Sequence, residues 1–279
     1  MMRHGRWQER TLQETAAFFE ADEAVRAVLV AGSLAREHGV LDAWSDVDLV
    51  VVLADGMMGR FFPGTAWLSA LGDVYGLDQS AASWGGVTRV CFADSRRFDL
   101  IFIAESAFPA ADTWASTPLW AGARALLSRS AAADAALAQA VSPPAFRPVS
   151  ADQFERMVER FRFKGMLAVS KVVRTDLLIA LHLALDLVRD CCVLGMMLRD
   201  RASGTAYHRA GGSGNLLVPR LEVTQQPYTA LGILDSIAQS IIIFDDLARQ
   251  WDPAYQDRQQ PLLAWIDDAR GAVIASQAD

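Results

Sequence analysis

The most constraining feature of this sequence is a pair of acidic residues inside an apolar run. Residues 46–53 (DVDLVVVL) have the composition of a buried β-strand, yet Asp46 and Asp48 lie at its start. Side chains alternate between the two faces of a strand, so both carboxylates point the same way while Val47 turns into the core. Two carboxylates on one face repel each other unless a cation lies between them, and their hard oxygens suit Mg²⁺. The run therefore predicts a strand that presents a cation site.

A third acid, Asp99, lies within a second apolar run, residues 97–103 (RFDLIFI). Burying an unpaired charge is very costly, so this carboxylate also needs a partner, and bound metal is the obvious candidate. Three carboxylates can hold two metal ions about 3.5–4 Å apart, which stabilise the attacking and leaving oxygens of an in-line displacement. We therefore expect Asp46, Asp48 and Asp99 to meet around divalent metal, with two Mg²⁺ ions as the expected number.

A glycine-serine pair precedes these acids. Residues 25–31 (VRAVLVA) form another predicted strand that leads directly into Gly32 and Ser33, and a helix is expected over 34–38. Glycine lets the backbone approach a phosphate closely, the N–H groups of a helix start favour an anion, and the Ser33 hydroxyl can donate to a phosphate oxygen. A Gly-Ser pair alone is an ordinary helix cap, and a lone Asp-x-Asp is weak evidence for metal. Their order, together with a third acid in a strand, is far more specific.

Strand patterns are confined to the first part of the chain. A hairpin is expected from residues 86–92 and 97–103, and the sequence pattern after residue 108 becomes helical. Residues 141–150 (VSPPAFRPVS) contain three prolines and mark the best candidate domain boundary. We therefore expect a small unit of strands and helices over 1–145 and a helical bundle over 146–279. Helices are expected over 7–20, 65–76, 131–140, 152–170, 174–199, about 229–250 and 260–275, and loops over 56–64 and 203–214.

Bulk properties exclude some classes of protein. The formal net charge is −7, which disfavours binding of polyanionic nucleic acid but suits a cationic small substrate. The three cysteines have neither a disulfide framework nor the CxxC spacing of a zinc site. The N-terminus has no apolar signal region, and no apolar stretch is long enough to span a membrane. We expect a cytoplasmic protein that binds neither nucleic acid nor membrane.

Two lysines and an acid are the candidates for a functional role in the helical half. Lys164 and Lys171 are the only lysines in the sequence and lie two helical turns apart, so they share a face. They are candidates for the β- and γ-phosphates of a nucleotide, although a solvated helix face is the plain alternative. Asp176 precedes an apolar helical run and could be a cap that supplies a first-turn carboxylate. His182 lies within that run and is expected to be a core residue.

The motifs resemble those of a known superfamily. The stretch GSLAREHGVLDAWSDVDLVVVL resembles the GSLARG…SDxDL signature of the polymerase-beta-like nucleotidyltransferases, and RFDLIFI looks like their third-acid strand. The order of the chain, with its helical second half, is similar to the bacterial aminoglycoside (streptomycin-type) adenylyltransferases. The likeness is strong over residues 25–103 and vaguer from residue 110 onward. It implies an α+β fold in which a small mixed β-sheet nucleotidyltransferase domain with flanking helices precedes a helical substrate-binding domain.

The resemblance also implies a chemistry and assigns roles. It implies ATP with Mg²⁺, and transfer of a nucleoside monophosphate to a hydroxyl with loss of pyrophosphate. Gly32, Ser33 and Arg36 would hold the triphosphate. Asp46 and Asp48 would ligate metal, and Asp99 would be a third ligand or the base that deprotonates the acceptor. Related enzymes place an acid of the helical domain at the acceptor, which here would be Asp176. The chain departs from the family pattern at residues 37–38, where a glycine is common.

The expected function is therefore transfer of AMP from ATP to a hydroxyl of a small molecule, an aminoglycoside-like antibiotic. The alternatives are a lincosamide or another metabolite as acceptor, and a non-catalytic binding module of the antitoxin type. The self-contained helical half and the full set of acids count against the binding module. Transfer to RNA or to a protein is a third alternative, and the net charge of −7 and the scarcity of lysine make recognition of a polynucleotide unattractive.

Overall fold

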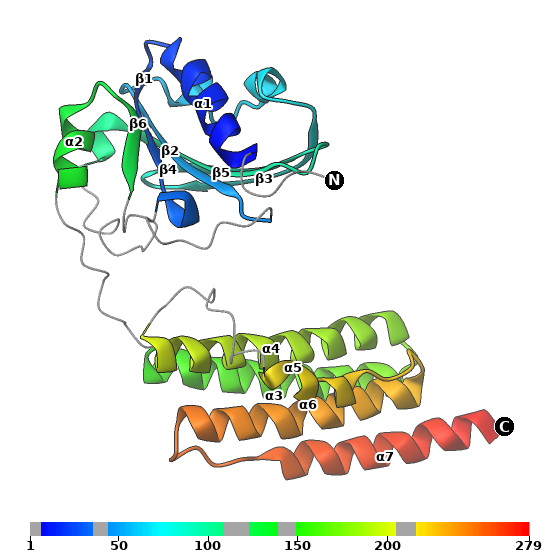
Figure 1. Cartoon of the computed structure of the whole chain (residues 1–279). Helices are drawn as coiled ribbons and strands as arrows, with labels where there is room; N and C mark the ends of the chain where they lie inside the picture. The colour runs from blue at the N-terminus through cyan, green and yellow to red at the C-terminus, as the bar shows by residue number, and fades with distance from the viewer. Residues whose placement is uncertain (1–6, 36–43, 109–122, 139–148, 205–215, 279) are drawn as a thin grey trace. The chain divides into compact units, whose positions relative to one another are not determined.

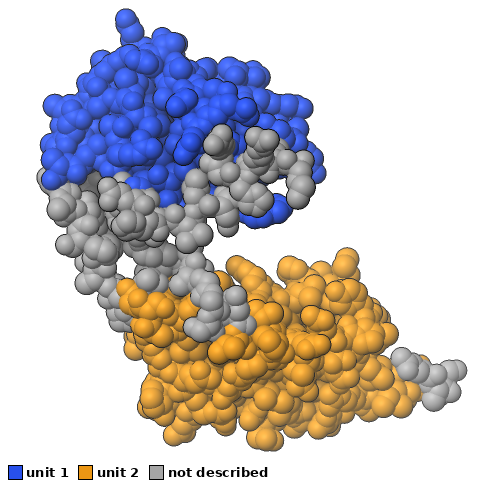
Figure 2. Space-filling view, viewed as in Figure 1, with its two compact units in different colours: residues 1–145 blue, residues 146–279 orange. Residues whose placement is uncertain are grey.

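The computed structural model describes residues 7–35, 44–108, 123–138, 149–204 and 216–278. The chain divides into two compact units, Met1–Ala145 and Phe146–Asp279, coloured blue and orange in Figure 2. The first unit is built on a β-sheet and the second on helices (Figure 1). Within the described residues, no helix combines the length and the apolarity that a membrane span requires.

The first unit contains a six-stranded sheet with the strand order β3-β4-β5-β2-β1-β6. β2 and β5 pair in parallel, and every other neighbouring pair is antiparallel, so the sheet is mixed. Helix α1 (Trp7–Glu20) precedes the sheet and α2 (Ala131–Ala138) follows it. The strands are β1 (Val25–Val30), β2 (Val47–Leu53), β3 (Val74–Ala82), β4 (Gly85–Phe92), β5 (Arg97–Ala104) and β6 (Arg124–Ser128).

Strand β2 is buried on both faces, which explains its continuous apolar run. Val47, Leu49, Val51 and Leu53 join the core that contains α1, while Val50 and Val52 join the smaller core on the opposite face, to which α2 contributes. Each fully buried aliphatic side chain stabilises the folded state by about 1.5–3 kcal/mol. A shift of register by one residue would exchange the two faces, so this double burial fixes the direction of both acids at the start of the strand.

Four predicted strands and the opening helix are confirmed, whereas two expected helices were wrong and two strands were missed. The expected helix over 65–76 is a 3₁₀ turn, Ala66–Ala70, followed by strand β3. Strand β6 was not predicted at all. The expected helix after Gly32 is a 3₁₀ turn over Gly32–Ala35, and residues 36–43 lie outside the described part of the chain.

The second unit consists of helices, as predicted. They are α3 (Ala151–Val173), α4 (Leu177–Ser203), the short α5 (Leu217–Arg220), α6 (Ala230–Trp251) and α7 (Gln259–Ala278). A capping box formed by Ser150 and Gln153 begins α3. Thr175 interrupts the expected helix over 174–199 with a φ of 59°, so α4 begins only at Leu177.

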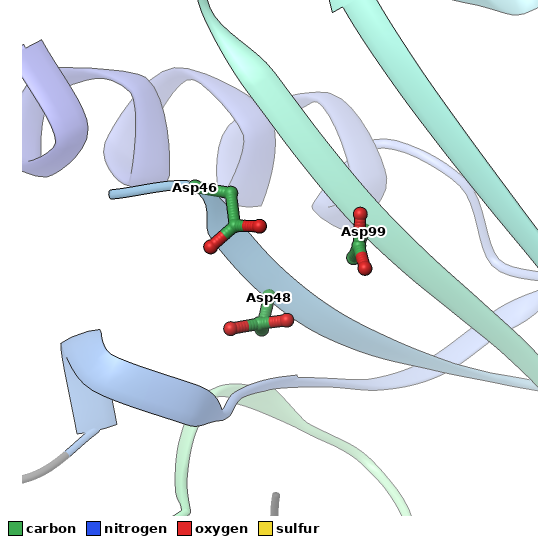
Figure 3. Close-up of side chains that lie close together, drawn as sticks. All are labelled: Asp46, Asp48 and Asp99. Carbon is green, nitrogen blue, oxygen red and sulfur yellow. The ribbon is translucent and has the colours of Figure 1, made fainter. Parts of the chain in front are cut away.

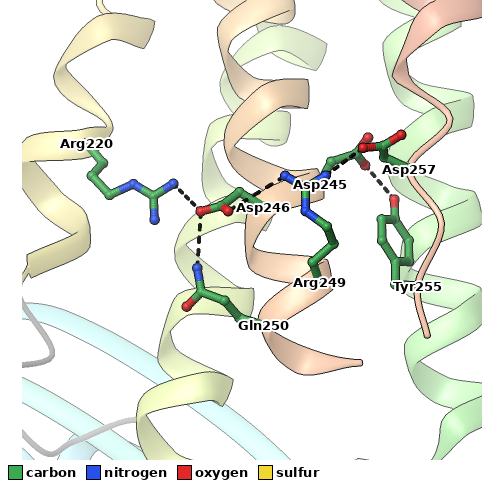
Figure 4. Close-up of polar contacts among 7 residues, drawn as sticks. All are labelled: Arg220, Asp245, Asp246, Arg249, Gln250, Tyr255 and Asp257. Carbon is green, nitrogen blue, oxygen red and sulfur yellow. Dashed lines mark hydrogen bonds and ion pairs between the residues drawn. The ribbon is translucent and has the colours of Figure 1, made fainter. Parts of the chain in front are cut away.

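One apolar core joins the long helices of this unit, and within it Phe161 of α3 stacks on Phe244 of α6. Polar side chains of α6 tie the helix to its surroundings (Figure 4). The Tyr255 hydroxyl donates to the Asp245 carboxylate, and burial raises the pKa of that carboxyl. Asp246 on the same helix pairs with Arg220. These contacts fix the segment after α6 and helix α5 against the bundle.

Candidate active site

Three carboxylates meet at the starts of strands β2 and β5. Asp48 lies in register with Asp99 on the neighbouring parallel strand, and Asp46 directly precedes β2. One carboxylate oxygen from each residue lies within 4.8 Å of the others (Figure 3). Asp48 is 5% exposed, while Asp46 and Asp99 are partly exposed. The three acids therefore lie together as the sequence predicted, with hard oxygen atoms that fit a divalent cation such as Mg²⁺.

The Gly32 turn lies directly against this cluster. The Ala31 N–H donates to the Asp48 carbonyl oxygen at 3.0 Å, which leads the chain from β1 past the start of β2. Gly32 has a φ of +65°, and a Cβ at this position would lie 1.9 Å from the Asp48 Oδ2. Only glycine fits this conformation and this space. Ser33 follows it, half-buried, in the same turn. The predicted phosphate-binding turn and the predicted metal ligands are therefore neighbours.

A basic residue that the sequence analysis did not single out also contacts the cluster. Arg89 of β4 lies in register with Asp99, and its Nε is 3.4 Å from the Asp99 Oδ2. The same guanidinium binds Asp78 on the edge strand β3 at 3.1 Å. The signal in the sequence was an arginine within the apolar run 86–92, but its relation to Asp99 depends on the register of two strands.

The loop before the acids is fixed at both sides. The Arg97 guanidinium, at the start of β5, donates to the Trp44 carbonyl oxygen. The Gln8 side chain of α1 donates to the Ser45 carbonyl at 3.3 Å. Because these bonds use backbone carbonyls, they fix the path of the chain into Asp46 without constraining its carboxylate.

Lys164 is engaged by acids of its own unit. Its Nζ lies 2.7 Å from the Asp186 Oδ2 and also binds Asp190, so it joins α3 to α4. The hydrogen bond from Lys164 lowers the pKa of Asp186. The Lys164 side chain is only 12% exposed. These contacts give the residue a structural role in the bundle beside its predicted role with phosphate.

Lys171 and Asp176 lie together at the junction of α3 and α4. The Lys171 Nζ is 2.9 Å from the Asp176 Oδ2, and this hydrogen bond lowers the pKa of Asp176. Both side chains are partly exposed, at 28% and 39%. His182 lies on an exposed face of α4, so the expectation that it is a core residue was wrong. Arg36 lies outside the described residues.

The sequence matches the model of one protein family. Residues 6–203 match the model of the streptomycin adenylyltransferase family. No curated protein matches the sequence. Among solved structures, the chain resembles an aminoglycoside 6-adenyltransferase from Bacillus subtilis, with 13% identity and a TM-score of 0.38 over 95% of this chain and 99% of that one. It also resembles a nucleotidyltransferase-like protein from Exiguobacterium sibiricum 255-15, with 10% identity and a TM-score of 0.36 over 86% of this chain and 76% of that one. Both TM-scores are low.

A mixed six-stranded sheet that carries the acid cluster is followed by a helical unit, which is the order of elements that the resemblance to nucleotidyltransferases implied. Because the family model covers most of the chain, from residue 6 to residue 203, the chain belongs to the streptomycin adenylyltransferase family. The protein is therefore an enzyme of the adenylyltransferase type. The resemblance to aminoglycoside adenylyltransferases that the motifs predicted is confirmed.

Proposed function

We propose that this enzyme moves AMP from ATP to a hydroxyl of an aminoglycoside-like antibiotic and releases pyrophosphate, with Mg²⁺ at the three acids. The observation that carries the proposal is that Asp46, Asp48 and Asp99 place oxygens within 4.8 Å of one another in a chain of this family. The Gly32 turn beside Asp48 supports a triphosphate site next to the metal site.

The donor set suits the proposed metal. Asp46 and Asp48 would be its ligands, and two ions are expected if Asp99 also binds. When bound, Mg²⁺ supplies positive charge that stabilises the phosphate oxygens and the leaving pyrophosphate. The contribution of the chain is to fix three carboxylates on neighbouring strands, so that little reorganisation is needed on binding.

The other residues near the site would bind and orient the reactants. The backbone N–H groups of the Gly32–Ala35 turn and the Ser33 hydroxyl would donate to phosphate oxygens. In the transfer, the acceptor hydroxyl oxygen forms a bond to the α-phosphorus, the bond to the pyrophosphate oxygen breaks, and the hydroxyl proton passes to a base. Asp99 is the proposed base if it is not a metal ligand. Arg36 is proposed to contact the triphosphate.

The acceptor is proposed from charge. The net charge of −7 favours a polycationic small molecule such as an aminoglycoside. Asp176 is the proposed acceptor-contacting acid or auxiliary base of the helical unit. The hydrogen bond from Lys171 lowers the pKa of Asp176, which makes the carboxylate a weaker base and favours contact with the acceptor over proton abstraction. Lys171, bound to Asp176, and Lys164 remain the proposed phosphate-binding lysines.

The test is a pyrophosphate-release screen of the intact protein. ATP, GTP, CTP and UTP are each combined with a panel of aminoglycosides and lincosamides, with Mg²⁺ present or removed by chelation. We expect release with ATP and an aminoglycoside only when Mg²⁺ is present. Release with a lincosamide alone would instead assign that acceptor class, and release without divalent metal would contradict the proposed centre.

A substitution in the cluster tests the assigned residues. Asp46→Asn removes one charged ligand and is expected to lower turnover on the order of 100-fold or more, with an unchanged circular dichroism spectrum. The matched control is Asp94→Asn in the exposed turn between β4 and β5, which is expected to keep full activity. Retention of activity in Asp46→Asn would refute its role. Thermal stability separates the enzyme from the alternative of a non-catalytic binding module. Mg²⁺ with a non-hydrolysable ATP analogue should stabilise the enzyme and should not stabilise such a module.

A further inference from the structure

A row of charged residues crosses four neighbouring strands of the sheet. Asp48 on β2 is in register with Asp99 on β5, Asp99 with Arg89 on β4, and Arg89 with Asp78 on β3. Residues in register on neighbouring strands point to the same face of a sheet. The row therefore connects the buried acid of the candidate metal site to an exposed acid on the edge strand.

The guanidinium of Arg89 is shared between the two acids beside it. Its Nε lies 3.4 Å from the Asp99 Oδ2, and its Nη1 lies 3.1 Å from the Asp78 Oδ2. The longer distance is to the acid of the site. Asp78 is 71% exposed and Asp99 only 22%, while Arg89 is 49% exposed. The forked guanidinium can serve two carboxylates, and its exposure leaves it free to change partners.

We propose that Arg89 is a positioning residue that occupies Asp99 in the metal-free enzyme and competes with divalent metal for the Asp99 carboxylate. Asp78 is the second partner, which retains the guanidinium when Asp99 releases it. The inference rests on the proposed function, because it assumes that Asp99 faces the metal. Its physical basis is that close carboxylates need a counter-cation, and Arg89 supplies one beside Asp99.

Substitutions of Arg89 and of its partner Asp78 should change metal affinity in opposite directions. Arg89→Gln removes a competing cation, so metal binding should tighten by about fivefold, the upper limit for a partly exposed ion pair. Asp78→Asn removes the alternative acidic partner, so Arg89 pairs more strongly with Asp99. Metal binding should therefore weaken by about twofold. If Asp78 acts through Arg89, its substitution has no effect in the Arg89→Gln background.

The experiment measures Mn²⁺ binding to the full-length protein by electron paramagnetic resonance. It compares wild type, Arg89→Gln, Asp78→Asn and the double variant. The matched control is Arg60→Gln, which breaks the 2.8 Å ion pair to Asp22 in the same unit, away from the charge row. This control should leave Mn²⁺ affinity unchanged, so a change in it would show that general loss of positive charge is enough and would overturn the inference.

The outcomes separate this inference from the proposed function. Asp46→Asn reports on the metal site itself: if wild type binds Mn²⁺ no better than this variant, the proposed metal centre fails. If wild type binds better but Arg89→Gln binds no tighter than wild type, only the inference fails. If Asp78→Asn weakens Mn²⁺ binding equally in wild type and in Arg89→Gln, the inference is also overturned. The loss of the Asp78 charge would then act on the metal directly and not through Arg89. Should Arg89→Gln not fold, the weakening by Asp78→Asn remains required.

Discussion

At the scale of single residues, Gly32 links backbone conformation to the position of Asp48. Its φ is +65°, and a Cβ added to it would come within 1.9 Å of the Asp48 Oδ2, so both the conformation and the space exclude a side chain. We predict that Gly32→Ala displaces the Asp48 carboxylate, weakens Mn²⁺ binding at least about tenfold and lowers the transferase rate with it. The backbone strain should also lower the free energy of unfolding by about 1–2 kcal/mol.

Gly56 provides the control for that strain. It has a φ of +78°, but a Cβ there would meet nothing within 4 Å. Gly56→Ala should therefore lose a similar amount of stability in urea unfolding while metal binding and turnover stay unchanged. If Gly32→Ala and Gly56→Ala bind Mn²⁺ with equal affinity, the close approach of Gly32 to Asp48 does not contribute to metal binding.

The residues of the acid cluster could be predicted from sequence, whereas their cationic neighbour could not. Asp46 and Asp48 follow from the two-residue period of a strand, and Asp99 from its position inside an apolar run. Arg89 lies opposite Asp99 only because β4 and β5 pair in one particular register. That register depends on packing across the whole sheet, so the sequence shows an arginine in a strand but not its partner.

At the scale of elements, prediction succeeded where burial imposes a pattern. Strand β2 is wholly buried and reads as an uninterrupted apolar run. Strand β3 lies at the edge of the sheet with most of its side chains exposed, so no apolar alternation marks it. The other edge strand, β6, is short and mostly half-buried or exposed. Neither strand carries the hydrophobic signal from which strands are predicted, and both were missed.

The contact between α3 and α4 gives a prediction at this scale. Lys164→Met leaves Asp186 and Asp190 without their shared cation, so the free energy of unfolding should fall by about 2–3 kcal/mol at pH 7. Because Lys164 lowers the pKa of Asp186, its contribution is present at neutral pH and is lost as the pH falls through that lowered pKa. The difference between the variant and wild type should therefore shrink below about pH 3.9.

Lys171→Met is the comparison for that prediction. Its ion pair with Asp176 is more exposed, so urea unfolding should show no measurable change. A stability loss in Lys171→Met as large as that in Lys164→Met would contradict the distinction between a bundle-forming lysine and an exposed one. A loss of ATP affinity in Lys171→Met alone would support its proposed role with phosphate.

At the scale of the whole molecule, the two units have separate hydrophobic cores. Leu53 of β2 and Leu187 of α4 are both fully buried, the first in the sheet unit and the second in the helical unit. Replacing either by alanine should cost about 3 kcal/mol, and a unit of this size should lose about 10 °C in unfolding temperature. We predict that Leu187→Ala lowers only the transition of the helical unit and Leu53→Ala only that of the sheet unit.

Differential scanning calorimetry would follow the two transitions, with hydrogen exchange assigning each to its unit. Mg²⁺ with a non-hydrolysable ATP analogue should raise the sheet-unit transition, because a ligand stabilises the state that binds it. That rise should persist in Leu187→Ala if the acids and the Gly32 turn supply most of the binding energy. If both transitions instead fall together in either variant, the chain unfolds as one cooperative body, and the separate cores do not confer separate stability.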